Sequence, residues 1–194
     1  MVWSAGASLE LRYTVAGDIA GLLVPAQTAP RRVDKLWQHT CFEAFAASSE
    51  AWMPTSPAEP TVGGRRTLAG DAAPNGAPAG QEGYYELNFS PSTQWAIYRF
   101  TAYREGMTAV QPTRAPRIAL HCDADRLTLE AHIELASLPG VRDAAGLRLA
   151  LSAVIEDKEH RLSYWALAHP QGKPDFHHAD GFALRLANPR SGCG

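Results

Sequence analysis

The chain has 194 residues, 45% of them hydrophobic, with a formal net charge of -2 at neutral pH. One domain over 1–194 can bury a single core, and the balanced charge without Lys/Arg runs excludes the electrostatic pattern of nucleic-acid or anionic-membrane binders. No apolar run is long enough to cross a bilayer and the first residues lack a secretion pattern, so we predict a cytoplasmic protein.

Two strands are predicted in the first half of the chain. Residues 9–14 alternate apolar and polar side chains, which indicates a half-buried strand. Residues 36–45 form a mostly apolar run, and one strand there would place His39 and Glu43 on the same face. A glutamate among apolar side chains is costly to bury unless it is paired. Glu43 is therefore expected either to face a ligand pocket or to pair with a base such as Arg99.

A change of composition separates these strands from the next ones. The stretch 48–83 contains five prolines and six glycines without periodicity, so we predict a long flexible insertion that carries no chemistry. Residues 84–91 and 95–102 then predict a hairpin, with Asn88 on the face opposite the core-facing residues.

The remaining strands follow at short intervals. Residues 117–121, 127–133 and 147–155 are predicted strands, and 156–161 is a charged hairpin tip. No stretch has the length and period of a substantial helix. Many short strands separated by turns predict an all-β fold, a β-sandwich.

The last long stretch concentrates ring-bearing and ionisable side chains. Residues 162–167 and 182–186 are predicted strands, and the prolines and glycine between them predict an irregular surface loop. Dense polar and aromatic side chains on such a loop are typical of a small-ligand pocket. The candidates in this stretch are Tyr164 and Trp165 of the first predicted strand, and Lys173, Asp175 and His177 of the loop.

Familiar catalytic signatures are absent from the sequence. A metal site that combines His169, Asp175 and either His177 or His178 is conceivable, and would permit a metal-dependent hydrolase. The ligand spacings match neither a standard zinc pattern nor a standard calcium pattern.

Four segments carry a resemblance to a known family. Residues 36–45, 84–91, 132–138 and 173–182 resemble, in that order, the DOMON-like superfamily related to family 9 carbohydrate-binding modules, and within it the bacterial stand-alone members. The match covers nearly everything outside 48–83. It implies a non-enzymatic, jelly-roll-like sandwich of two antiparallel sheets with a ligand site on one sheet face or its rim.

The resemblance also implies roles for particular residues. In the sugar-binding relatives tryptophans stack on the sugar, and Trp37 and Trp165 occupy positions where such platforms are expected. Glu43 fits the acidic position of the first motif. Haem-binding relatives use methionine and histidine as axial ligands, whereas Met53 and Met107 lie outside the matching segments.

We therefore predict a non-enzymatic module that binds a small-molecule ligand, a small carbohydrate or sugar derivative, through an aromatic and polar site on one sheet face. A haem-binding or redox module and a metal-dependent hydrolase are the alternatives. No cofactor is expected under the favoured interpretation, while haem and calcium belong to the alternatives. The candidate ligand-binding residues are Trp37, His39, Glu43, Asn88, Arg99, Tyr164, Trp165, Lys173, Asp175 and His177.

Overall fold

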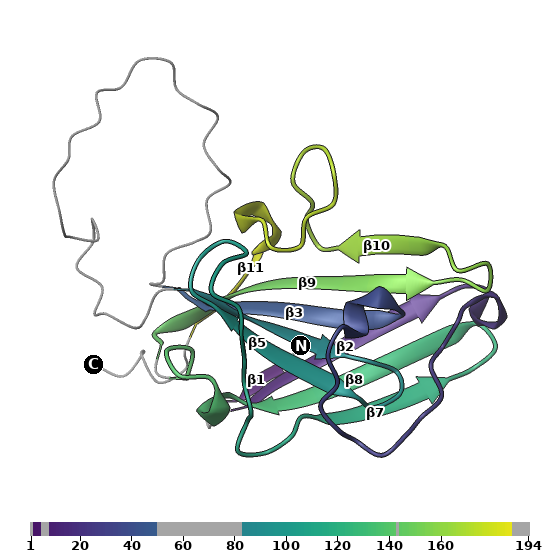
Figure 1. Ribbon diagram of the computed structural model, residues 1–194, viewed down its shortest axis with the longest axis horizontal. Helices are drawn as coiled ribbons and strands as arrows, with labels where there is room; N and C mark the ends of the chain where they lie inside the picture. The colour runs from purple at the N-terminus through teal and green to yellow at the C-terminus, as the bar shows by residue number, and fades with distance from the viewer. Residues whose placement is uncertain (1, 5–7, 50–82, 143, 188–194) are drawn as a thin grey trace, which may run out of the picture.

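The computed structural model describes residues 2–4, 8–49, 83–142 and 144–187, which form two antiparallel sheets (Figure 1). The small sheet has the order β1-β2-β8-β7, with β1 Val2–Ser4, β2 Ser8–Ala16, β8 Arg126–Glu134 and β7 Arg117–Cys122. The large, seven-stranded sheet has the order β10-β9-β3-β4-β5-β6, with β11 also paired to β9. Its strands are β10 Leu162–Ala166, β9 Gly146–Glu156, β3 Cys41–Ser48, β4 Tyr84–Phe89, β5 Trp95–Phe100, β6 Thr108–Ala109 and β11 Leu184–Ala187.

This architecture confirms the predicted all-β sandwich of two antiparallel sheets. The helical segments in the described part of the chain are single 3-10 turns: η1 Ile19–Gly21, η2 Leu36–Gln38, η3 Leu135–Ser137 and η4 Ala179–Gly181. The hairpin of β4 and β5 is also confirmed, as are the strands predicted at 9–14, 117–121, 127–133 and 147–155. The predicted insertion at 48–83 lies outside the described residues over 50–82.

The two sheets are buried to different extents. In the small sheet, β8 alternates buried and half-buried side chains, because only one of its faces meets the core. In the large sheet every residue of β3 and β4 is buried, which requires cover on both faces. The inner face packs on the small sheet through side chains such as Phe42 and Leu87. The outer face holds a second apolar cluster that includes Phe45, Tyr84 and Phe182.

Two irregular segments cover that outer face. The segment 27–40 contributes η2, which packs across β3 and β4, and the segment 167–183 contributes η4, which packs beside β9 (Figure 1). Trp37 of the first segment and Phe176 of the second are partly buried against the outer apolar cluster. The outer face is therefore the place where both covering segments and the large sheet meet.

The predicted single strand over 36–45 is wrong in its first half. Residues 36–38 form η2, preceded by Lys35 in the left-handed conformation with φ of 62°. The strand begins only at Cys41, because Thr40 is held by other bonds. Its Oγ1 donates to the Leu23 carbonyl at 2.7 Å and accepts from the Glu156 backbone N–H at 3.1 Å.

Candidate functional site

Four polar side chains lie together at the centre of the outer face of the large sheet. They are Glu43 of β3, Glu86 and Asn88 of β4, and Ser152 of β9, and we call them the carboxyl cluster. The register pairs Glu43 with Asn88 on one side and with Ser152 on the other, so these side chains point the same way. Glu43 is 3% exposed, Glu86 6%, Asn88 0% and Ser152 4%. Glutamates are rarely buried this completely unless they are paired.

The members of the cluster bond to one another, and Glu43 has a single, long side-chain hydrogen bond. Asn88 Nδ2 donates to Glu86 Oε1 at 2.7 Å, while Ser152 Oγ donates to Glu43 Oε2 at 3.4 Å. Burial, with a smaller effect of the nearby Glu86, raises the pKa of Glu43 to about 8. Burial likewise raises the pKa of Glu86. Glu43 is therefore a neutral carboxylic acid at pH 7.

His177 closes one side of the cluster from the segment 167–183. Its Nδ1 lies 2.7 Å from the Tyr84 hydroxyl, and its Nε2 lies 3.6 Å from Glu86 Oε2. The Tyr84 oxygen accepts the Arg104 backbone N–H at 3.2 Å, which leaves its own proton for His177 Nδ1. Burial lowers the pKa of His177 to about 4, so the ring is neutral, with its Nε2 proton toward Glu86.

Asp175 anchors the same segment to the turn after β5. It accepts hydrogen bonds from the Tyr103 hydroxyl, from Arg104 Nη2 at 2.8 Å and from the His177 backbone N–H at 3.0 Å. Burial alone would raise the pKa of Asp175, but these hydrogen bonds hold it below its ordinary value. Asp175 therefore positions His177, while its own oxygens are occupied.

Two aromatic rings flank the outer face. The Trp37 ring meets Tyr98 edge-on with centroids 5.7 Å apart, and Phe176 tilts against Tyr164 at 6.1 Å. Both Trp37 and Phe176 keep part of their surface exposed. Phe176 is thus the second ring beside the site. The sequence pattern of the loop does not show which face this ring covers.

Trp165 does not share this face. Tyr164 pairs with Val154 and Trp165 with Ala153, so the two β10 rings point to opposite sides of the sheet. Trp165 is 65% exposed and lines a groove of about 530 Å³ at the open side of the sandwich, whose other lining residues include Phe42, Leu151, Ile155 and Val15. The expected pair of tryptophans around one ligand is therefore not formed.

Three other candidate residues also lie apart from the cluster. His39 is outside β3, and its exposed ring bonds to Glu156 at 2.8 Å. Arg99 shares the inner side of β5 with Ile97, so strand alternation rules out the predicted ion pair with Glu43. Lys173 is exposed in the segment 167–183.

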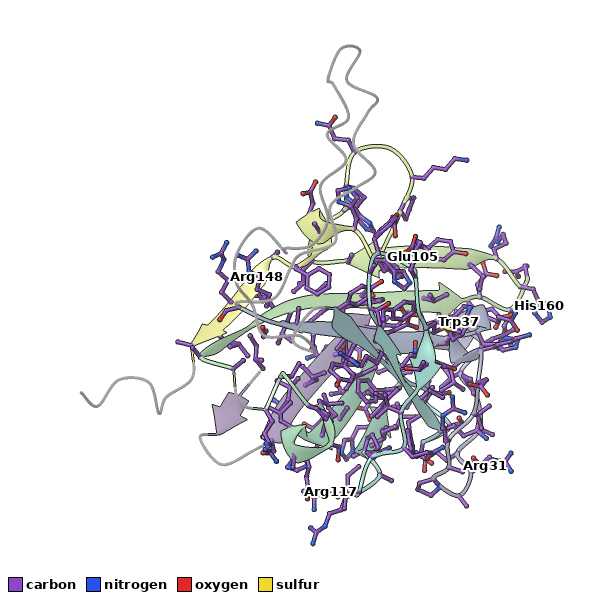
Figure 2. All side chains as sticks on the ribbon, turned by 60° about the vertical axis from the view of Figure 1, so that its left-hand side comes forward. Arg31, Trp37, Glu105, Arg117, Arg148 and His160 are labelled. Atoms are coloured by element: carbon purple, nitrogen blue, oxygen red, sulfur yellow. The ribbon has the colours of Figure 1, made fainter. Side chains whose placement is uncertain are left out.

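Figure 2 shows Trp37 and His160 on the side of the large sheet, with Arg117 of the small sheet at the opposite side.

The alternative metal site gains no support from these positions. His169 packs against Phe176 with ring centroids 6.1 Å apart, while Asp175 and His177 are engaged as described. Over the described residues, no group of three or more His, Cys, Asp or Glu side chains could hold a metal ion.

The structure therefore links Glu43, Asn88, Asp175 and His177 on the outer face, and places Trp37 and Tyr164 beside them on the same face. It adds members that sequence reasoning missed, namely Tyr84, Glu86, Tyr103, Arg104, Ser152 and Phe176.

Comparisons of the chain with protein-family models, with curated proteins and with solved structures found no match. The resemblance to DOMON-like domains therefore stays a prediction. None of the helices among the described residues has the length and apolar character needed to span a membrane.

Proposed function

We propose that the chain is a non-enzymatic module that binds a small carbohydrate or sugar derivative at the carboxyl cluster. The observation that carries the proposal is the state of Glu43, a neutral carboxyl whose hydrogen-bonding partner is one hydroxyl at 3.4 Å. A protonated carboxyl offers one donor and further acceptor sites. Sugar hydroxyl groups both donate and accept, so they match this unused capacity.

The cost of burying Glu43 supports a ligand-facing role. An imperfectly paired polar group in an apolar setting costs on the order of 1–3 kcal/mol. A structural ion pair would offset that cost, but no basic side chain in the described part of the chain bonds to Glu43. Costly polar groups of this kind concentrate at functional sites.

The two rings and the segments that cover the outer face determine how a ligand would reach the carboxyl cluster. Trp37 and Phe176 offer apolar surface on which the C–H face of a sugar ring can pack, while Glu86, Asn88 and Ser152 offer hydrogen bonds. Because Glu43 is 3% exposed, we expect binding to require a movement in one of the two segments that cover the outer face. Both rings lie outside the strands, where such a movement disturbs no sheet hydrogen bonds.

Binding can be tested with a panel of mono- and disaccharides, using thermal shift followed by calorimetry. We expect at least one sugar to raise the melting temperature of the natural sequence. Glu43→Met keeps the length of the side chain but removes its hydrogen bonds, so affinity should fall about tenfold or more. Glu130→Gln, a change at a half-buried glutamate of the small sheet, is the matched control and should bind normally. The proposal fails if no sugar shifts the melting curve, or if Glu43→Met binds as tightly as the control.

A further inference from the structure

β10 leaves one edge of the large sheet open. It pairs with β9 on one side, and within the described residues no strand pairs with its other side. Monomeric proteins protect such edges with charged residues, prolines or bulges. The five residues Leu162–Ala166 contain no charge and no proline, and their register with β9 is continuous. None of these protections is present in β10.

The same edge carries a concentration of exposed apolar side chains. Five large hydrophobic residues are exposed in the described part of the chain, and four of them fall within 162–167. Leu162 is 37% exposed, Tyr164 47%, Trp165 65% and Leu167 56%. Single exposed apolar residues are common, but a contiguous group of them marks an interaction surface.

We infer that β10 pairs antiparallel with β10 of a second copy, joining two large sheets across a two-fold axis. An open strand edge presents alternating N–H and C=O groups, which another strand can satisfy in register. When the pairing is centred on Tyr164, this residue faces its own copy, Ser163 faces Trp165, and Leu162 faces Ala166. No like charges meet in this register, so β10 can pair with the same strand of a second copy.

The surrounding sequence does not oppose this pairing. The first charged residue before the strand is Arg161, and in this register it comes opposite Leu167 of the second copy. The axis is perpendicular to the sheet, so the outer faces of both copies point in one direction. In this pairing the second copy covers Tyr164 on the outer face of the sheet and Trp165 on the inner face. The carboxyl cluster is not part of the interface.

Sedimentation velocity on the full chain, over about 1–100 µM, tests this dimer. We expect the dimer fraction of the natural sequence to rise with concentration. Tyr164→Arg places two guanidinium groups against each other only in the dimer, and should weaken association about tenfold or more. Met107→Arg adds the same charge at another exposed apolar residue, outside β10, and should leave association unchanged.

A charge-reversal experiment separates loss of the interface from loss of the fold. Tyr164→Glu alone should also weaken association about tenfold or more, and a mixture with Tyr164→Arg should form a mixed dimer, because opposite charges then meet on the axis. The inference is overturned if the natural sequence stays monomeric throughout the range. It is equally overturned if Tyr164→Arg associates as the natural sequence does, or if the mixture shows no dimer. Sugar binding is measured separately, so either proposal can fail alone.

Discussion

Replacing Glu43 with Gln should stabilise the fold by an amount that grows with pH. Burial and the nearby Glu86 raise the pKa of Glu43 from an ordinary value of 4.5 to about 8. The unfolded chain therefore releases this proton at a lower pH than the folded chain. A carboxyl of this kind contributes its full stability below the unfolded pKa, and loses that contribution as the pH rises toward the folded pKa.

The size of the effect follows from the gap between the two pKa values. One unit of difference corresponds to about 1.4 kcal/mol between the two protonation states. Ionisation of Glu43 in the unfolded chain therefore favours unfolding by roughly 3 kcal/mol at pH 7, and by roughly 1 kcal/mol at pH 5. Glutamine has nearly the same shape and can accept from Ser152, but it has no proton to lose. The variant should gain these amounts.

Urea unfolding followed by circular dichroism at several pH values between about 5 and 8 measures this gain. The difference in free energy of unfolding between Glu43→Gln and the natural sequence should rise across the range. The control Glu130→Gln lies on the small sheet, outside the carboxyl cluster, and is measured at the same pH values. A flat difference for Glu43→Gln, or a loss of stability at pH 7, would show that the folded chain holds Glu43 as a paired carboxylate.

Two further predictions concern the sides of the cluster. Burial lowers the pKa of His177 from 6.5 to about 4, so stability should fall as the pH drops through this window, by roughly 3 kcal/mol at its acid end. His177→Gln should reduce that acid sensitivity in melting experiments, and an unchanged acid transition would contradict the buried neutral ring. Trp37→Ala should weaken sugar binding about tenfold or more while Trp165→Ala leaves it unchanged, because only Trp37 lies on the outer face. Calorimetry with the same sugar compares the two, and equal losses would refute this assignment.

Local sequence patterns were sufficient for most strands. Alternation over 127–133 and the turn after Pro91 predict β8 and the β4–β5 hairpin, because each signal depends on neighbouring residues. The error at 36–38 arose where conformation depends on distant contacts. Thr40 is tied to Leu23 and Glu156, and periodicity carries no information about such bonds.

The site was predictable only in part, for a related reason. Alternation within β4 places Glu86 and Asn88 together opposite the core, and this is visible in the sequence. Whether that face is solvated or buried depends on the segments 27–40 and 167–183, which pack over it from far along the chain. Which residues of different strands share a face depends on register, so the separation of Glu43 from Arg99 could not be read from their strands individually.

The protonation states of the cluster bear on the kind of ligand it can take. At neutral pH Glu43 is protonated, since its pKa is about 8, and His177 is neutral, since its pKa is about 4. Calcium prefers ionised carboxylates, so a protonated Glu43 is a poor ligand for that ion. His177 Nδ1 is engaged by Tyr84, and its Nε2 carries the proton that faces Glu86, so neither nitrogen is free to coordinate haem iron. Glu43, Asn88 and Ser152 then act as uncharged donors and acceptors beside two rings, which supports the proposed polyhydroxylated ligand. Raising the pH above about 8 would ionise Glu43 in the folded chain and weaken binding to any ligand group that accepts its proton.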